Sequence, residues 1–310
     1  MAIKTLICVP LCGFANRLKF LASIKGISKK LRCHDIKVVW KSTMDCKVSF
    51  QDAFKNIPGF ELMDEEAIYE RKEDVLYYGY VHMNQIIENL KAERNKKPIL
   101  VIEGGHECKH PDVHHLDFLK HKQDFYRSIE WSTDIEERVS KLGELPKIGI
   151  HYRHVIEHTD QADVKSNPFC NFSQNSPFSH FEILMKRCKQ KAFFLSNSGY
   201  HKNYVSTNLP QKKFVVIHEE DMNDRSSNES MKMSIVEFII LSRCELIIGS
   251  YFSSFSDEAS YFNLSPKYMP MTKCPNLEPF VRNYHSVIKP TQFGEDIILN
   301  MNMEKVVTYL

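Results

Sequence analysis

The stretch IKTLICVPLCGFANRLKFLASIKGISKKLRCHDIKVVW, residues 3–40, decides the fold class of this chain. Residues 3–10 are mostly apolar and predict a buried strand, which a turn at 11–13 follows. From residue 15 to residue 31, apolar residues recur at helical spacing with Lys and Arg between them. Residues 36–40 predict a second strand. A strand, a helix and a strand in this order predict a parallel βαβ unit.

The same alternation continues along the chain and predicts an α/β protein with two units of similar size. A helix expected at 134–142 ends at Gly143 and Pro146, so we place the domain boundary there, between domains 1–145 and 146–310. Parallel units of this kind direct their strand ends toward a cleft, here shared by both domains. The other expected strands are 75–81, 99–103, 192–195, 214–218 and 245–249, and the other expected helices are 49–56, 181–189, 234–242, 253–262 and a terminal helix 296–309 that packs back on the first domain.

The composition is that of an ordinary globular protein. Of 310 residues, 43% are hydrophobic and 26% are charged. The net charge of +2, from 41 Lys+Arg against 39 Asp+Glu, argues against a nucleic-acid partner. No run approaches the roughly 18 apolar residues of a membrane span, and the short apolar N-terminus is not expected to be a cleaved signal. Nine cysteines without a framework spacing favour reduced thiols and a cytoplasmic location.

The segment KIGIHYRHVIEHTD, residues 147–160, carries the densest group of titratable side chains. It predicts a short apolar strand at 148–150 that leads directly into His151 and Arg153, at the edge where an α/β sheet presents its chemistry. The five donors of Arg153 match the oxygens of a phosphate. The same letters contain H-x-x-E-H at 154–158, the inverted zinc-protease signature. That motif needs a helix, but here it follows a strand directly and runs into a predicted loop, which disfavours zinc.

Three further segments are candidate sites. The turn GFANRL at 13–18 opens a helix, whose N–H groups suit an anion, with Arg17 as an added charge. Glu237 lies within an apolar helix and needs a polar or cationic partner. Ser253 and Ser254, near Ser250 and Ser256, follow a strand and open a helix, where they either bind phosphate or cap the helix.

The chain offers no convincing metal site. One cluster has a spacing that matches no standard zinc motif, so solvated imidazoles in a polar loop are expected instead. A D-x-D triplet is absent, so a diphosphate would be held by Arg, hydroxyl and N–H groups rather than by a carboxylate-bound metal. The members of that cluster are His106, Cys108, His110, His114 and His115.

These segments, in this order, resemble the fucosyltransferase superfamily of the GT-B type, which includes nodulation, core α-1,6 and protein O-fucosyltransferases. ICVPLCGFANRLKFLASIKGISKKL is similar to the family's strand, G-x-x-N-R/Q-L turn and long helix. VVWKSTMDCKVSFQDAFKNI is similar to the next segment of the bacterial and viral members. IGIHYRHVIEHTD resembles its H-x-R-R-x-D motif, and IVEFIILSRCELIIGSYFSSFSDEASYF its last helix-strand-serine block. The resemblance spans residues 3–262.

The resemblance implies two Rossmann-like domains facing a cleft, with the acceptor on the first and a GDP-sugar mainly on the second. GDP-fucose is the default donor, and another GDP- or NDP-hexose is the alternative; no resident cofactor is implied. Arg153 would then hold the β-phosphate within the His151–His154 motif. The other positions implied to contact the donor are Gly13, Asn16, Arg17, Asn197, Ser198, Glu237, Ser253 and Ser254.

Two departures from the family pattern concern the chemistry. His154 stands where the family has a second Arg, and the expected Asp is displaced, with Asp160 the nearest. We expect an inverting, metal-independent transfer to a glycan or other hydroxyl acceptor near the predicted loop 103–121, with Glu157 or Asp160 as the base. The alternatives are a zinc hydrolase that uses His154, Glu157 and His158, and a non-catalytic nucleotide-sugar-binding protein.

Overall fold

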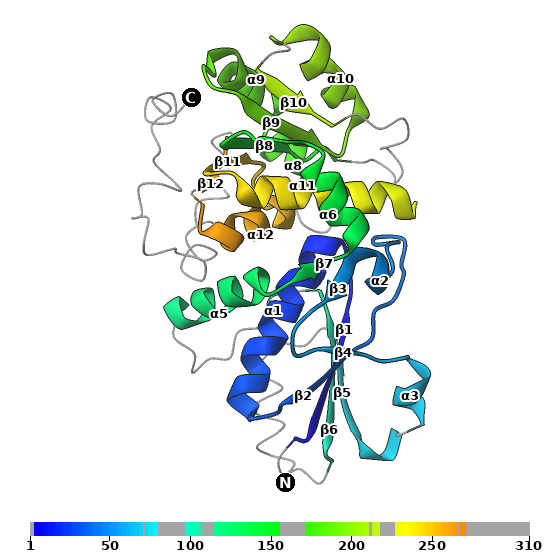
Figure 1. Cartoon of the computed structure of the whole chain (residues 1–310). Helices are drawn as coiled ribbons and strands as arrows, with labels where there is room; N and C mark the ends of the chain where they lie inside the picture. Colours follow the sequence, from blue (N-terminus) through cyan, green and yellow to red (C-terminus); the bar gives the residue numbers. More distant parts are fainter. Residues whose placement is uncertain are drawn as a thin grey trace. The chain divides into compact units, whose positions relative to one another are not determined.

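In the computed structural model the chain forms two α/β units, each built on its own five-stranded parallel sheet (Figure 1). The first unit comprises Met1–Arg138 and Arg225–Ile235, and the second comprises Val139–Asp224 and Val236–Leu310. The structure describes residues 3–70, 72–79, 97–105, 107, 115–155, 171–210, 213–217, 227–265 and 267–270. The predicted α/β class, with two Rossmann-like units, is confirmed.

The sheet of the first unit has the strand order β4-β2-β1-β6-β5. Helix α1, Phe14–Leu31, follows β1 after a three-residue turn and packs against it. On one sheet face, Ile7, Val9 and Val101 form an apolar core with Ile68. The strands are β1 Thr5–Pro10, β2 Asp35–Val38, β4 Glu61–Leu62, β5 Val75–Gly79 and β6 Ile99–Gly104.

Short elements complete the first unit. An antiparallel pair of strands, β3 Phe54–Asn56 and β7 Glu130–Trp131, brings Phe54 onto Trp131, with ring centroids 5.6 Å apart. The ring centroids of Phe54 and Trp40 lie 5.5 Å apart, so this aromatic cluster joins segments far apart in the sequence. The helices are α2 Phe50–Ala53, α3 Glu66–Tyr69, the 3-10 turn η1 Lys72–Asp74, α5 His115–Arg127 and α6 Thr133–Ser140.

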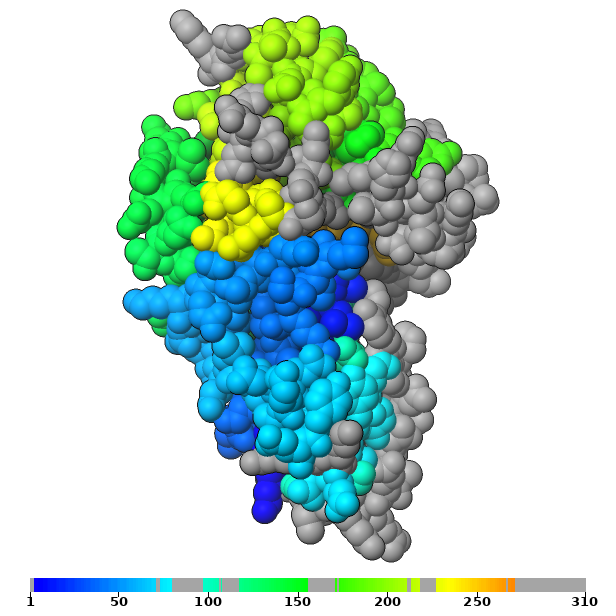
Figure 2. Space-filling model, turned by 90° about the vertical axis from the view of Figure 1, so that its right-hand side faces the viewer, coloured from blue at the N-terminus to red at the C-terminus, as the bar shows by residue number. Residues whose placement is uncertain are grey.

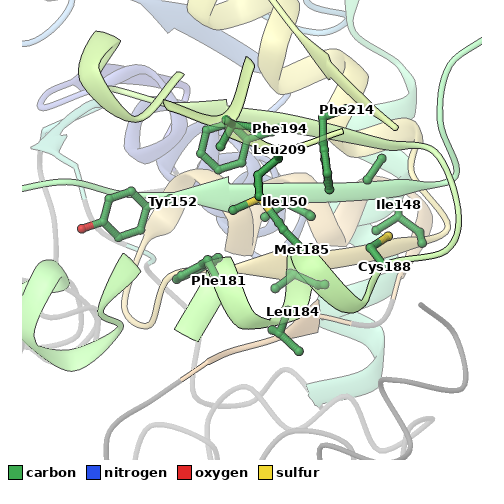
Figure 3. Close-up of a cluster of buried hydrophobic side chains, with 13 residues drawn as sticks. Ile148, Ile150, Tyr152, Phe181, Leu184, Met185, Cys188, Phe194, Leu209 and Phe214 are labelled. Atoms are coloured by element: carbon green, nitrogen blue, oxygen red, sulfur yellow. The ribbon is translucent and has the colours of Figure 1, made fainter. Parts of the chain in front are cut away.

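The sheet of the second unit has the order β10-β9-β8-β11-β12. Figure 3 shows Ile150 and Tyr152 along β8, with Phe181 and Leu184 of α9 packed against the same core. Gly149 lets α11 approach the sheet, because a Cβ there would lie 2.4 Å from a methyl carbon of Leu241. The strands are β8 Ile148–Tyr152, β9 Ala192–Ser196, β10 Phe214–Val216, β11 Leu246–Gly249 and β12 Lys267–Tyr268, and the helices are α8 Phe172–Asn175, α9 Phe178–Arg187, α10 Gly199–Asn208, α11 Asn228–Arg243 and α12 Ser254–Asn263.

Each sheet contains a point where the strand order reverses. In the second unit, the chain runs from β8 to β9 and β10 on one side, and β11 and β12 lie on the other side. In the first unit, β1 leads to β2 and β4 on one side, with β6 and β5 on the other. Ligands of open α/β sheets bind at the carboxyl ends of the strands beside such a reversal. The candidate binding segments are therefore those after β8 and β11, and after β1 and β6.

Several elements differ from those expected. The helix predicted at 49–56 is only α2, because residues 54–56 pair with β7 as a strand. Helix α5 begins at His115 within the segment predicted as a loop, and α10 was not predicted at all. The division between the units falls inside α6, after Arg138, and inside α11, after Ile235. The first turns of α11 therefore belong to the first unit, where Lys232 Nζ lies 3.0 Å from Asp134 Oδ2. The expected terminal helix lies outside the described residues. No helix that the structure describes is long and apolar enough to cross a bilayer.

Candidate functional site

Hydrogen bonds join the segments that follow β8 and β11, at the strand-order reversal of the second unit. Strand β8 is parallel to β11, with His151 opposite Gly249. The backbone N–H of Ser250 donates to the carbonyl of His151 at 3.0 Å, and the N–H of Arg153 donates to the Ser250 hydroxyl at 2.9 Å. The predicted Arg and serine segments, about 100 residues apart in the chain, therefore lie side by side.

His151 lies at the centre of this edge as a buried, neutral imidazole. It is 4% exposed and stacks on Phe255, with ring centroids 5.0 Å apart. Burial, together with the charges of Lys267, Arg153 and Lys202, holds the pKa of His151 well below its usual range. Among the described residues, its Nδ1 has no hydrogen-bond partner. Lys267 is paired with Asp257 and Lys202 with Glu237, so the positive charge around this neutral ring is partly balanced.

The serine turn after β11 presents helix N–H groups next to these cations. Phe252 has a left-handed φ of 58°, and Ser253 occupies the N-cap position of α12. The Ser253 side chain makes no capping hydrogen bond, which disfavours helix capping as the reason for this serine. At Gly249 a Cβ would lie 2.5 Å from the Ser256 hydroxyl, so only glycine allows α12 to approach the sheet this closely. The arrangement suits a phosphate group.

Asn197 and Ser198 lie beside this edge, but both use their side chains on neighbouring protein groups. Asn197 Oδ1 accepts from the His154 N–H at 2.7 Å, and its Nδ2 donates to the His154 carbonyl at 2.9 Å. The Ser198 hydroxyl and His201 Nδ1 are hydrogen-bonded at 2.9 Å. Asn197 thus fixes the backbone next to Arg153. Its predicted contact with a nucleotide stays a prediction, as does that of Ser198.

His201 was not predicted as part of the site and packs among aromatic rings. Its ring centroid lies 4.5 Å from that of Phe178, 4.7 Å from that of Tyr152 and 5.1 Å from that of His154. Burial and the nearby His154 lower the pKa of His201 from 6.5 to about 4. A single histidine in a sequence gives no signal of such an environment, because all three neighbours come from other elements.

This lowered pKa makes stability depend on pH. Below pH 6.5 the unfolded chain gains a proton at His201 that the folded chain accepts only near pH 4, so stability should fall as the pH drops through this window. We expect the loss of Tm between about pH 7 and pH 5 to be smaller in His201→Gln than in the parent. Thermal unfolding at both pH values tests this, and equal losses in the two proteins would contradict it.

Glu237 has the cationic partner that its apolar helix required. It is 4% exposed and pairs with Lys202, which is 1% exposed and also donates to the carbonyl of Ile217 at 3.3 Å. Lys202 was missed in the sequence because it lies on α10, the helix that the apolar pattern did not reveal. The pair joins α10 to α11, so Glu237 has a structural partner, and its predicted role toward a nucleotide stays a prediction.

In the first unit, Arg17 is fully buried and serves the fold. Its Nε donates to the Cys12 carbonyl at 2.9 Å, Nη1 to the Lys41 carbonyl at 2.6 Å, and Nη2 to the Thr43 hydroxyl at 2.8 Å. The guanidinium also lies 4.7 Å from the centroid of the Trp40 ring. The exposed fraction of Arg17 is 0%, and its predicted contact with a diphosphate stays a prediction. Gly13 and Asn16 remain partly exposed at the start of α1, and their predicted role stays open.

We expect Arg17→Lys to destabilise the protein by about 2 kcal/mol or more, because one ammonium cannot replace a fork that donates in three directions. Denaturant unfolding at neutral pH measures the change. Arg243→Lys, at an exposed position, is the matched control and should leave the unfolding midpoint unchanged. If both variants unfolded at the parent's midpoint, Arg17 would not hold these segments together.

Several predicted residues lie outside the described part of the chain. These are the candidate bases Glu157 and Asp160, His158 of the H-x-x-E-H motif, and His106, Cys108, His110 and His114. Residues 153–155 are irregular backbone rather than the helix that the zinc motif needs at His154. Within the described ranges, no group of three potential ligands is placed to hold a metal ion.

Solved structures with a similar fold were found. No protein-family model and no curated protein matches the sequence. The fucosyltransferase NodZ from Bradyrhizobium is 16% identical, with a TM-score of 0.53 over 84% of this chain and 93% of that chain. A mutant of Arabidopsis thaliana FUT1 in complex with GDP is 14% identical, with a TM-score of 0.54 over 87% and 71%. POFUT1 in complex with GDP-fucose is 11% identical, with a TM-score of 0.50 over 84% and 95%.

Proposed function

We propose that this chain, which has the GT-B fold of fucosyltransferase structures, is an inverting, metal-independent glycosyltransferase. It transfers fucose, or a related hexose, from a GDP-sugar to a glycan or other hydroxyl acceptor. The observation that carries the proposal is the anion-binding edge of the second unit. There, Arg153 and the serine turn meet at the strand-order reversal, beside the buried, neutral His151. NodZ was co-crystallised with GDP, and its crystals were soaked with GDP-fucose, which supports a guanosine nucleotide as the ligand.

In this mechanism the acceptor hydroxyl attacks C1 of the sugar as the bond from C1 to the diphosphate oxygen breaks. One displacement inverts the anomeric centre. Negative charge grows on the β-phosphate, where the Arg153 fork and the first N–H groups of α12 stabilise it. His154 supplies no second permanent cation, so Arg153 carries a larger share of this stabilisation. Glu157 or Asp160 takes the proton of the attacking hydroxyl, which contributes about 10²–10⁴-fold.

The second unit prepares this edge before any ligand binds. The hydrogen bonds of Asn197 to His154, and of Ser250 to Arg153, fix the backbone from which the guanidinium extends. The neutral state of His151 avoids a fourth positive charge in a buried position. Groups that are already oriented need no reorganisation when charge develops, which is the main source of electrostatic catalysis.

A thermal-shift screen of nucleoside diphosphates, followed by donor-consumption assays, tests the function. GDP should raise the Tm, since a ligand at 100 times its Kd adds about 2.7 kcal/mol of stability, and EDTA should not change this effect. GDP-fucose or another GDP-hexose should then be consumed with release of GDP. If GDP raises the Tm but no donor is consumed, the protein binds nucleotides without catalysing transfer. If the purified protein contains stoichiometric zinc, and chelation removes both the zinc and the activity, the protein is a zinc hydrolase and the proposal is wrong.

A further inference from the structure

In the first unit, five side chains form one continuous polar chain near the carboxyl end of the sheet. The Tyr69 hydroxyl donates to Glu65 Oε1 at 3.1 Å, and Lys41 Nζ lies 2.7 Å from the same oxygen. Lys41 Nζ is also 3.9 Å from Glu103 Oε1, and the Tyr77 hydroxyl donates to Glu103 Oε2. We call Lys41, Glu65, Tyr69, Tyr77 and Glu103 the tyrosine–glutamate cluster.

The cluster lies at the rim of a defined sheet face. Tyr77 on β5 and Glu103 on β6 lie on the same face as Val101, which belongs to the apolar core beneath α3. Glu65 and Tyr69 lie at the two ends of α3, whose Ile68 covers that core. Figure 2 shows this side of the first unit, with the segment that holds α3 and β5 in light blue to cyan.

Both tyrosine rings are exposed, although their hydroxyls are bound. Tyr69 is 57% exposed and Tyr77 is 54% exposed, which makes them two of the few large hydrophobic side chains that the described surface leaves open to solvent. A ring whose hydroxyl is fixed keeps one orientation and offers a flat apolar face at little cost in side-chain entropy.

Hydrogen bonds within the cluster shift the pKa values of its side chains. The hydrogen bond from Lys41 lowers the pKa of Glu65, and the hydrogen bond to Glu65 raises the pKa of Tyr69. Burial and the hydrogen bond to Glu103 raise the pKa of Tyr77. At neutral pH the cluster therefore presents carboxylates that accept, an ammonium that donates, and neutral phenols. One Lys against two Glu gives a formal charge of −1, which disfavours phosphates and nucleic acids.

We propose that the tyrosine–glutamate cluster binds the sugar rings of a neutral oligosaccharide. A sugar ring has an apolar face of C–H groups, which covers an exposed phenol ring, and hydroxyls at its edge, which bond to carboxylate and ammonium groups. Each ligand group thus has a partner of the matching kind in the cluster. The inference rests on the proposed function in one respect: the oligosaccharide is the acceptor.

Binding of the purified protein to a microarray of neutral oligosaccharides, followed by calorimetric titration of any saccharide retained, tests the site without requiring transfer. Tyr77→Ala and Tyr69→Ala should each weaken binding about tenfold. Tyr77→Phe keeps the ring and should weaken binding about threefold. Tyr204→Ala is the matched control. This substitution removes a similar hydrogen bond in the second unit, which the Tyr204 hydroxyl donates to Glu182 at 2.6 Å. The variant should bind the saccharide as tightly as the parent does.

Each outcome decides the proposal. Loss of binding in the two Ala variants, with an unchanged Tm for Tyr77→Phe, supports it. Failure of the parent protein to retain any saccharide overturns it, as does binding that is equal in the parent and both Ala variants. Retention of basic peptides in place of saccharides overturns it as well. The GDP thermal shift reports on the second unit, so failure of that assay is distinguishable from failure here. In transfer assays the Ala variants should raise the acceptor KM and leave the donor KM unchanged.

Discussion

Arg153→Ala is expected to lower kcat/KM for transfer from GDP-fucose, or from another donor that the protein is shown to use, by at least about 10²–10³-fold. Arg153 directly follows β8, its backbone N–H donates to the Ser250 hydroxyl, and its charge helps to lower the pKa of the buried His151. Removal of the guanidinium takes away the main charge that meets the leaving diphosphate. The measurement is initial-rate kinetics with purified protein, with GDP release as the readout.

Two comparisons separate this role from a structural one. Arg153→Lys keeps the charge but cannot bind two phosphate oxygens through a planar fork, so its activity should remain well below that of the parent. The Tm of both variants should match that of the parent, because the Arg153 side chain is only partly buried. Near-normal transfer by Arg153→Ala in a folded protein would remove Arg153 from the mechanism.

The second large effect concerns stability. Glu237→Leu or Lys202→Leu alone should each destabilise the protein by about 3–5 kcal/mol, because either change leaves one charge buried without its partner. Both side chains are almost completely buried, and together they join α10 to α11. The double variant Lys202→Leu/Glu237→Leu should recover most of the loss, since it leaves no charge to desolvate. Urea unfolding followed by circular dichroism gives all three values.

An exposed pair provides the control for this experiment. Lys147 Nζ and Glu245 Oε1 lie 2.9 Å apart, but their side chains are 70% and 68% exposed. Glu245→Gln should not change the urea midpoint measurably, because surface ion pairs contribute little. If the double variant were as unstable as the single variants, the lost packing of these side chains, and not the unpaired charge, would explain the effect.

The fold was predictable from the sequence wherever one local pattern determines an element. The apolar strand β1, the helical spacing of α1 and the apolar run at β8 each agree with the structure to within two residues. Helix α10 escaped prediction because the residues it buries include His201 and Lys202, so its inner face carries no apolar pattern. The sequence pattern predicts helix at strand β3, because only its pairing with β7, a contact between distant segments, makes these residues a strand.

The candidate site was predictable in its location but not in the use of each side chain. The order of strands brings Arg153 next to Ser250, as expected for segments at adjacent strand ends. Whether a polar side chain faces a ligand or a neighbouring backbone depends on distances between elements. Asn197 illustrates this, because its amide serves the His154 peptide, and Arg17 illustrates it more strongly, because its donors serve three protein oxygens.

The burial of Arg17 has a consequence for how related sequences should be interpreted. An N-R-L turn after the first strand would indicate that a related protein has the same fold, because the Arg17 side chain joins the segments that follow two neighbouring strands. The Arg that follows β8 would indicate instead that the related protein can catalyse transfer. A relative that keeps the first arginine and lacks the second should therefore retain this architecture while having lost transfer. One that keeps only the second should be less stable, however complete its catalytic motif looks in an alignment.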